Sequence, residues 1–308
     1  MRGSYPFEIK SLPCLPNPIF PEYDFVLPFL KFQGDVLHVH TPYGLGVAAF
    51  SSPLSKVATT HTLPHHLVEF MFKKEIPEGL LAIGWRYLTW FFNHFDRVIC
   101  QTHATEKMYR KYGLRAKTEV IPNGINVEEF RGGDPDRFRK KYEIKRPFAM
   151  FLGRFDYTKR PNWIIDIAKS LPEYRFLLVG FGPLDKDLPR LPNTIFLRRL
   201  TPEDKIDAFK AASMLIMPSR VETEGIVAQE ALACGTPVII ADNDVLHEVI
   251  GDVGFRCSSL EDMKEKVRVL FENESMLSEM RAKAIEQVKK RDINKSVDLL
   301  CQLYEKLS

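Results

Sequence analysis

Two glutamates around a helix start are the residues of this sequence best placed to do chemistry. Glu222 and Glu230 lie eight positions apart, the first in a turn after the apolar run 214–217 and the second in an apolar stretch closed by Gly235. The start of a helix that follows a strand presents free backbone N–H groups and a positive dipole end, which suit a phosphate group. One carboxylate can then face a sugar and the other a ribose, although isolated glutamates are more often exposed and solvated.

Cationic candidates follow the apolar run 148–152. Gly153 allows the chain to leave a strand tightly, and Arg154 and Lys159 lie in the loop that follows, at the carboxyl edge of the predicted sheet. An arginine fork and a lysine point charge can hold a diphosphate there and stabilise the negative charge that it gains on leaving a sugar. Two basic side chains on a loop, taken alone, are more often simply solvated.

These segments resemble one known family. The stretch from Glu222 to Glu230 resembles the E-x7-E signature of the retaining nucleotide-sugar glycosyltransferases of family 4, which have the two-domain GT-B fold. Gly153, Arg154 and Lys159 match the family's G-R-x4-K donor pattern residue by residue. The resemblance implies transfer of a hexosyl group from a nucleotide diphosphate sugar to a hydroxyl acceptor with retention (EC 2.4 type), without a covalent nucleophile. In such an enzyme Arg154 and Lys159 would stabilise the leaving diphosphate. Glu222 would bond sugar hydroxyls and Glu230 the ribose.

A strand exit with two glycines lies between these segments. Gly180 and Gly182 stand in a V-G-x-G-P sequence, which counts against a dehydrogenase because no third glycine occupies the helix position. The resemblance places this sequence beside the donor nucleotide, with base contacts at the end of the next strand, where Arg198 is the predicted contact. Arg198 and Arg199 replace a glycine-containing pair that is usual in the family, so the base, uridine or guanosine, stays open. The remaining donor contacts implied by the resemblance are Glu224, Gly225, Ile226 and Val227.

Two positions depart from the family pattern. Glu224 replaces the usual aromatic residue of E-x-F-G and adds a third acid beside the phosphates, where it should repel them unless a cation pairs with it. The stretch 242–248 lacks the two glycines that are usual after this strand. Both changes would alter the donor or weaken its binding.

Histidines follow two predicted strands in the first half of the chain. His38 and His40 are interpreted as packing residues, which is the ordinary role of a histidine in this position. His61 matches the family's T-x-H position, where the histidine lies by the transferred sugar, so we predict a contact with the sugar or the transition state. Asn123 and Gly124 resemble the family's I-P-N-G turn before the hinge and are interpreted as structural.

Strand-like and helical segments alternate along nearly the whole chain, which predicts the α/β class with parallel sheets flanked by helices. We expect two Rossmann-like domains, an acceptor-side domain over residues 1–140 and a donor domain over 141–290, and a helix over 291–308 that returns to the first domain. The first domain is expected to be incomplete at its N-terminus, because the stretch 7–28 resembles what the family has after its first strand, glycine-rich loop and helix. A truncated start, or a partner chain that completes the domain, would account for this.

Composition argues against several functional classes. The net charge of +3 gives no electrostatic sign of nucleic-acid binding. The five cysteines are scattered and odd in number, as in reduced cytoplasmic proteins, and no C-x-x-C or H-E-x-x-H spacing indicates a zinc site. We therefore expect no metal and no cofactor besides the donor substrate. No apolar segment is long enough to span a bilayer.

An aromatic-rich segment, 85–96, is apolar on most of its circumference. A helix of this kind is usually part of the core, and this is the favoured interpretation. The alternative is a peripheral face that meets anionic lipid, with His65, His66, Lys73 and Lys74 at the headgroups. The segment looks like the lipid-acting members of family 4, including diacylglycerol glucosyltransferases, sulfoquinovosyltransferase and phosphatidylinositol mannosyltransferase. That resemblance implies a sugar or glycolipid acceptor and a place at the inner face of the cytoplasmic membrane.

Two rival functions stay open at this stage. A nucleotide-sugar 2-epimerase of the same fold also uses acids near a diphosphate, and release of free nucleotide only when an acceptor is present would exclude it. A non-catalytic partner subunit would bind no donor by itself and would gain order only with a second protein.

Overall fold

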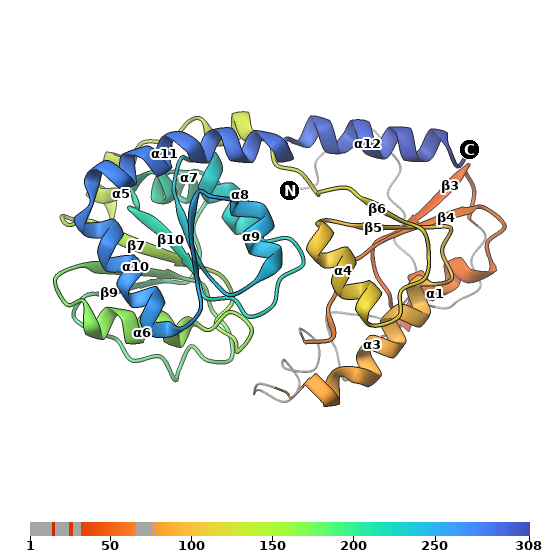
Figure 1. Cartoon of the computed structure of the whole chain (residues 1–308), viewed down its shortest axis with the longest axis horizontal. Coiled ribbons are helices and arrows are strands. Elements are labelled where there is room, and N and C mark those ends of the chain that lie inside the picture. Colours follow the sequence, from red (N-terminus) through yellow and green to blue (C-terminus); the bar gives the residue numbers. More distant parts are fainter. Residues whose placement is uncertain (1–13, 16–24, 27–31, 66–75, 77) are drawn as a thin grey trace.

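The computed structural model describes the chain except for residues 1–13, 16–24, 27–31, 66–75 and 77. Two all-parallel sheets with helices packed on them form two domains within the described residues (Figure 1). The predicted α/β class with two Rossmann-like domains is confirmed. The expectation of an incomplete first domain concerns residues 1–31, most of which lie outside the described part of the chain.

The first sheet has four strands in the order β3-β4-β5-β6, all parallel. Their bounds are Val36–Val39, Ser55–Thr59, Arg97–Cys100 and Thr118–Val120. Among the described residues of this domain, the helices are α1 (Leu45–Ala48), α3 (Glu78–Phe92) and α4 (His103–Lys111), and a short antiparallel pair, β1 (Cys14–Leu15) and β2 (Phe25–Val26), precedes them. Within the segment 85–96, the aromatic side chains of Trp85, Phe91, Phe92 and Phe95 are buried in the core, whereas Trp90 is exposed.

The second sheet has six parallel strands in the order β12-β11-β10-β7-β8-β9. In chain order these are β7 (Phe148–Leu152), β8 (Arg175–Val179), β9 (Thr194–Leu197), β10 (Met214–Met217), β11 (Val238–Ala241) and β12 (Gly254–Cys257). The apolar runs predicted as strands at 148–152 and 214–217 are β7 and β10, at the centre of the sheet. Both are buried along most of their length, as continuous apolar strands between two helix layers should be.

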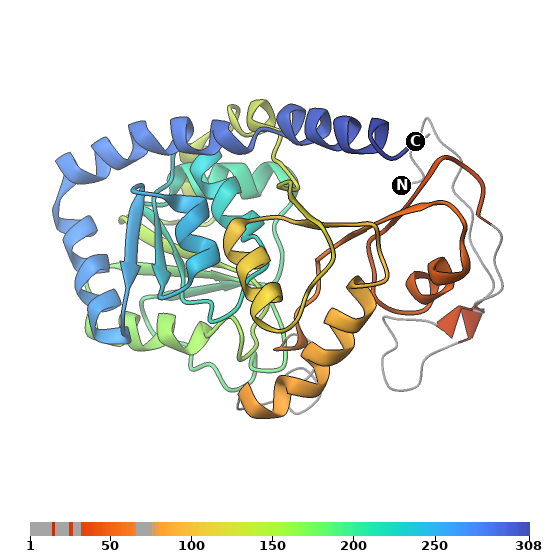
Figure 2. The same cartoon turned by 45° about the vertical axis from the view of Figure 1, so that its right-hand side comes forward.

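Helices cover this sheet on both faces and also connect the two domains. They are α5 (Pro135–Lys141), α6 (Pro161–Ser170), α7 (Pro202–Ala211), α8 (Ile226–Ala233), α9 (Asp244–Ile250), α10 (Leu260–Glu272), α11 (Glu274–Val288) and α12 (Ile293–Glu305). The part of the chain that the structure describes also has short 3₁₀ segments at Ala49–Ser51, Val127–Phe130 and Lys289–Arg291. Figures 1 and 2 both show α11 and α12 along one side of the molecule, running from the second domain back to the first.

The packing of α12 fixes its place on the first domain. Leu303 packs with Val57, Ile99 and Ile121 of that domain, and the Tyr304 hydroxyl lies 2.5 Å from Nδ1 of His38. The chain leaves the first domain after β6, and the core of the second domain already includes Ile125, Val127 and Phe130. The chain therefore changes domain near Asn123 and Gly124, somewhat before the predicted boundary at residue 140.

Candidate active site

The two predicted donor segments meet at the carboxyl edge of the second sheet. Lys159 follows β7 and Glu222 follows β10, the neighbouring strand, and Lys159 Nζ lies 2.5 Å from Glu222 Oε1. Glu222 is buried and Lys159 is half-buried. A largely buried ion pair of this kind holds both groups in one geometry, and removing one partner leaves an uncompensated charge.

Asp156 shapes the loop that presents Lys159. Its Oδ1 accepts hydrogen bonds from the backbone N–H of Thr158 (3.0 Å) and Lys159 (3.1 Å), an Asx-type turn. The Thr158 carbonyl in turn accepts the N–H of Arg220 at 2.8 Å, which joins the loop after β7 to the loop after β10. Arg154 stands at the start of the same loop with half of its side chain exposed, 3.4 Å from Asp156.

The second predicted glutamate lies on α8. Gly225 precedes this helix with φ +77°, and a Cβ there would lie 2.4 Å from a methyl carbon of Leu246, so glycine suits both the backbone and the packing. No side chain caps this helix start, which leaves the N–H groups of Ile226 and Val227 for a ligand. Glu230, one turn further on, pairs with Lys205 of α7 at 2.6 Å.

The remaining donor-side residues lie on the exit from β8 and β9. A Cβ at Gly180, where φ is +151°, would come within 1.9 Å of the Gly153 carbonyl oxygen. Gly180 and Gly182 therefore let the loops after β7 and β8 lie against each other. Arg198 is exposed, with its guanidinium carbon 4.8 Å from the ring centroid of Phe181.

A hydrogen-bonded chain of neutral side chains holds His61 at the carboxyl edge of the first sheet. Thr60 Oγ1 donates to Gln101 Oε1 at 3.2 Å, so the Gln101 amide N–H groups are free to donate to His61 Nδ1 at 3.3 Å. His61 Nε2 then carries the proton and donates to His40 Nδ1 at 3.1 Å. The His40 Nε2–H is left at the end of the chain.

Burial and mutual proximity keep these imidazoles uncharged. Burial, followed by the charge of His40, lowers the pKa of His61 to about 4. Burial also lowers the pKa of His40. His38 has a pKa of about 3, chiefly from burial and then from His40 and His61, and its Nε2 lies 2.6 Å from Thr59 Oγ1. Its two ring nitrogens thus bond Thr59 and Tyr304, in keeping with its interpretation as a packing residue.

A pocket of about 760 Å³ lies between the two domains and reaches Glu222. One wall is α4, which places His103, Lys107 and Lys111 at successive turns along it. The loops after β10 and β11 form the facing wall, with Arg220 and Asp242 among their lining residues. Trp85, Met108 and Val245 add an apolar lining, so the pocket joins basic and apolar surface.

Family models match both halves of the chain. The model described as glycosyl transferases group 1 matches residues 134–291, about half of the chain and most of the domain that carries Lys159, Glu222 and Glu230. The chain belongs to the group 1 glycosyltransferases. A second model, described as glycosyltransferase family 4, matches residues 7–129. The resemblance inferred from the two glutamates and the G-R-x4-K segment is thereby confirmed.

Relatives of this glycosyltransferase include proteins named for lipid glycosylation. It is 26% identical over 248 residues to an alpha-monoglucosyldiacylglycerol synthase of Streptococcus pneumoniae, covering 73% of this chain and 56% of that protein. It is 24% identical over 313 residues to a sulfoquinovosyl transferase of Arabidopsis thaliana, covering 92% of this chain and 60% of that protein. The chain thus spans less than two thirds of the length of these two relatives.

Solved structures agree on the fold. Anabaena HepE in complex with UDP-glucose superposes with a TM-score of 0.76 at 19% identity, over 89% of this chain and 79% of HepE. At this identity the likeness establishes the GT-B architecture of the glycosyltransferase and nothing finer.

Glu224, predicted as a donor contact, has another environment in this glycosyltransferase. Its side chain is 1% exposed, and its carboxylate accepts hydrogen bonds from the backbone N–H (3.0 Å) and Nδ2 (2.5 Å) of Asn123. Arg291 lies 3.8 Å away, the cation that the sequence required. Burial raises the pKa of Glu224, with Gln229, Arg291 and Asn123 acting in the opposite direction. The carboxylate thus bonds the first domain instead of extending the donor surface.

Several residues of the site were not predicted. Lys205, Gln101 and Arg291 each bond a predicted residue, but none lies in a motif.

Of the basic residues proposed for lipid headgroups, His65 is buried and lines the pocket, and the other three lie outside the described residues. Within the described part of the chain, no cluster of three or more His, Cys, Asp or Glu is arranged to hold a metal ion, and no helix could cross a membrane.

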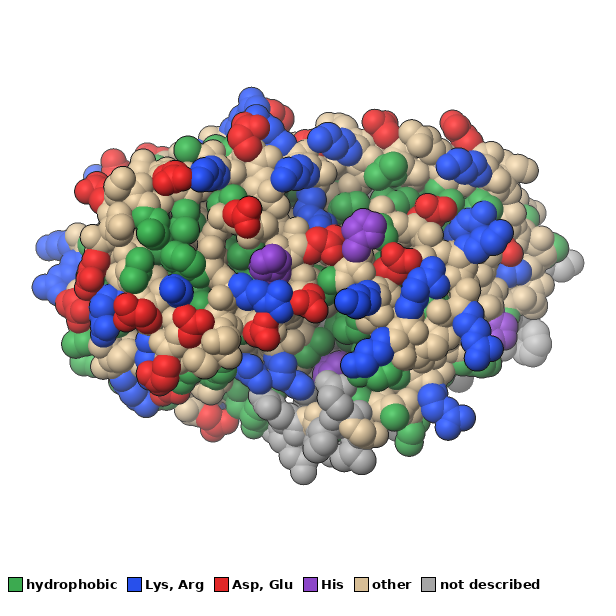
Figure 3. Space-filling model, viewed as in Figure 1, with side chains coloured by type: hydrophobic (Ala, Val, Ile, Leu, Met, Phe, Trp, Pro, Cys, Tyr) green, Lys and Arg blue, Asp and Glu red, His purple; other side chains and the backbone are tan. Residues whose placement is uncertain are grey.

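Surface charge is mixed. On the face seen in Figure 3, basic and acidic side chains alternate over both domains instead of forming a field of one sign. The mixed charge on this face fits the net charge of +3.

Proposed function

We propose that the protein transfers a hexosyl group from a nucleoside diphosphate sugar to a hydroxyl acceptor with retention of configuration. The observation that carries the proposal is the pairing of Lys159 with Glu222 beside the uncapped start of α8. A diphosphate at this edge would meet Lys159, Arg154 and the N–H groups of Ile226 and Val227. Glu222 would then share Lys159 with the phosphates and turn its second oxygen to the sugar hydroxyls, while Glu230 would bond the ribose.

In the reaction the bond between the anomeric carbon and the phosphate oxygen breaks, and the acceptor oxygen bonds the same carbon on the same face. The acceptor hydroxyl proton passes to the leaving phosphate oxygen, so protons and charge balance without a covalent intermediate. Lys159 and Arg154 stabilise the charge that develops on the diphosphate. Their positive charge serves this step without a divalent cation, and His61 supplies a neutral hydrogen-bonding group on the sugar side.

The acceptor hydroxyl would reach the donor through the pocket between the domains, since that pocket contains Glu222. Its mixed basic and apolar lining suits an acceptor with a polar head and an apolar part, such as a glycolipid. On α3, Ile83 is 80% exposed and Trp90 49% exposed, and they lie on one side of the helix with Arg86. This small face supports peripheral contact with anionic lipid, at the inner face of the cytoplasmic membrane.

A donor screen tests the proposed activity. UDP- and GDP-sugars are added singly, thermal stabilisation is recorded, and nucleotide release is measured with and without glycolipid acceptors. We expect one donor to stabilise the fold, release that depends on the acceptor, and a product whose anomeric NMR coupling matches that of the donor. Conversion of the donor to its epimeric nucleotide sugar without an acceptor would instead indicate an epimerase, and no stabilisation by any donor would favour a non-catalytic subunit.

Vesicle flotation tests the lipid contact. The chain should float with anionic vesicles at low salt and less well at high salt, because the attraction is electrostatic. A variant with Ile83→Ser and Trp90→Ser should float less, while Ile285→Ser, at an exposed apolar position on α11, serves as the control. Failure of the wild type to float at low salt would remove this part of the proposal.

A further inference from the structure

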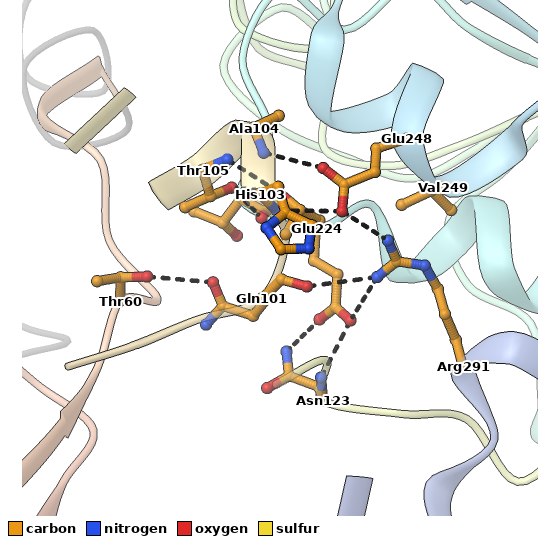
Figure 4. Close-up of polar contacts among 12 residues, drawn as sticks. Thr60, Gln101, His103, Ala104, Thr105, Asn123, Glu224, Glu248, Val249 and Arg291 are labelled. Atoms are coloured by element: carbon orange, nitrogen blue, oxygen red, sulfur yellow. Dashed lines mark hydrogen bonds and ion pairs between the residues drawn. The ribbon is translucent and has the colours of Figure 1, made fainter. Parts of the chain in front are cut away.

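Four residues form a polar cluster where the chain changes domain, which we call the hinge cluster: Asn123, Glu224, Glu248 and Arg291 (Figure 4). Asn123 follows the last strand of the first sheet, Glu224 lies in the loop before α8, and Glu248 lies on α9. Arg291 stands just before α12, where the chain returns to the first domain. The hinge cluster therefore contains residues from both places where the chain passes from one domain to the other.

Two carboxylates of the second domain reach across to backbone groups of the first. Glu248 accepts the N–H groups of His103 (3.1 Å) and Ala104 (2.9 Å) at the start of α4. A carboxylate at a helix N-terminus is stabilised by the helix dipole as well as by these hydrogen bonds. Glu224 likewise accepts two hydrogen bonds, one from the backbone N–H and one from the side-chain amide of Asn123.

Arg291 links the two carboxylates to each other. Its Nη2 lies 3.3 Å from Glu248, its Nη1 lies 3.8 Å from Glu224, and Nη1 also donates to the Gln101 carbonyl at 3.3 Å. Gln101 is the residue that bonds His61, so the network ends at the sugar side of the proposed site. Because Arg291 and Glu224 are both buried, these interactions are little screened by water.

The loop 218–225 between β10 and α8, here called the donor loop, bonds both domains through consecutive residues. Glu222 bonds Lys159 within the second domain, whereas the Thr223 carbonyl accepts the hydroxyl of Thr105 on α4 at 2.7 Å. Glu224 then bonds Asn123. A change in the angle between the domains must either break the bonds of Thr223 and Glu224 or move the loop that carries Glu222.

We propose that Glu224 is a positioning residue, which sets the angle between the domains and ties it to the placement of Glu222. The expected effect on kcat rests on the proposed function. The expected effect on the angle between the domains does not depend on it. Affinity for the nucleotide part of the donor depends on groups within the second domain, so disrupting the hinge cluster should lower kcat and leave nucleotide binding nearly unchanged. A group that merely stabilised the donor loop would lower both together.

Exchanging the carboxylate of Glu224 and the side-chain amide of Asn123 tests the proposed role of Glu224. Asn123→Asp places two carboxylates against each other. Glu224→Gln removes the charge that faces Arg291 and leaves one oxygen where two accept hydrogen bonds from Asn123. The double variant Asn123→Asp/Glu224→Gln restores a carboxylate opposite an amide. Glu286→Gln, an exposed residue of α11 paired with Lys289, is the matched control.

Each single variant should lower kcat about ten- to hundredfold, the loss expected when reacting groups are misplaced by roughly an ångström. The double variant should recover at least about tenfold of the Asn123→Asp loss, as coupled neighbours do. The dissociation constant for the donor nucleotide should stay within about threefold in all variants, a change below one hydrogen bond. Small-angle X-ray scattering should show a larger radius of gyration for Asn123→Asp than for the wild type, and a return in the double variant.

The proposal is overturned if the double variant recovers neither kcat nor the radius of gyration, or if nucleotide affinity falls in parallel with kcat. Unchanged kcat and scattering in both single variants would also overturn it. Should Asn123→Asp not fold, Glu224→Gln and the double variant give the same comparison. A wild type that transfers no sugar would remove the proposed function, while the scattering comparison would still decide the role of Glu224 in setting the domain angle.

Discussion

The carboxyl edges of the two sheets carry opposite kinds of polar chemistry. On the second sheet, or on the helices beside it, charged groups stand in pairs: Lys159 with Glu222, Arg154 with Asp156, and Lys205 with Glu230. On the first sheet the polar groups are His38, His40, His61 and Gln101, which hydrogen-bond one another or their neighbours. Charge is concentrated where a diphosphate would leave, and uncharged directional groups are concentrated where a sugar would lie.

The cause of this difference is local. Three imidazoles so close together cannot all hold a proton, and partial burial pushes the pKa of His38 to about 3 and of His61 to about 4. On the other edge each cation already has a carboxylate, which holds it in place before any phosphate arrives. The comparison therefore predicts that substitutions on the two edges will have different effects on rate, affinity and pH dependence.

The largest effect is expected at the cations of the second domain. Lys159→Ala or Arg154→Ala should reduce turnover by about two to three orders of magnitude, as loss of a contact to a developing negative charge does. Lys169→Ala, an exposed lysine of α6 that pairs with Asp166, is the matched control in a turnover assay. Because Lys159→Ala leaves Glu222 unpaired, thermal unfolding of each variant is measured alongside. Unchanged turnover in both variants would remove the proposed charge stabilisation.

A smaller effect is expected at Glu230, the proposed ribose contact. Glu230→Gln should raise KM for the donor about tenfold with kcat nearly unchanged, since it weakens a charged hydrogen bond made equally in the ground and transition states. Steady-state kinetics with varied donor give both constants. A fall in kcat at constant KM would show that Glu230 acts in the chemical step, which contradicts its assignment.

On the first domain, His61→Gln should lower kcat by up to about tenfold, the value of a single neutral hydrogen bond. Because a pKa of about 4 keeps His61 neutral at higher pH, the shape of the rate profile between pH 5.5 and 8 should be the same in the variant and the wild type. Loss of a rate limb near pH 6 in the variant would mean that His61 titrates there, and the contrast between the two edges would fail.

The smallest effect concerns stability. The folded state lowers the pKa of His38 from 6.5 to about 3, so the unfolded chain binds a proton below pH 6.5 that the folded chain does not. Stability contributed by neutral His38 is complete above pH 6.5 and is lost as the pH falls from there towards 3. Urea unfolding at pH 7.5 and 5.5 should show a smaller loss of stability at the lower pH in His38→Gln than in the wild type. Equal losses would contradict the assignment of His38 as a half-buried neutral group.

Local sequence predicted that Lys159 and Glu222 lie at one edge of the second sheet, because both residues follow strand ends. Lys159 and Glu222 come after two apolar runs, and adjacent parallel strands bring such loops together. Lys205 could not be predicted in the same way, because it reaches Glu230 only through the packing of α7 on α8. The environment of Glu224 depends on the angle between the domains, which no local pattern encodes. The sequence shows that Glu224 replaces the family's aromatic residue, but it marks the partner Asn123 only as part of a turn.

The most direct test of the account is a titration calorimetry series with three proteins, the wild type, Lys159→Ala and His61→Gln, and the nucleoside diphosphate of the donor found in the screen, UDP or GDP. If the carboxyl edge of the second sheet holds the nucleotide and His61 serves the sugar, the wild type and His61→Gln will bind this nucleotide equally. Lys159→Ala will then bind about tenfold more weakly or worse, as expected for a lost charge-assisted contact. Equal weakening in both variants, or unchanged binding by Lys159→Ala, would contradict the division between the two edges.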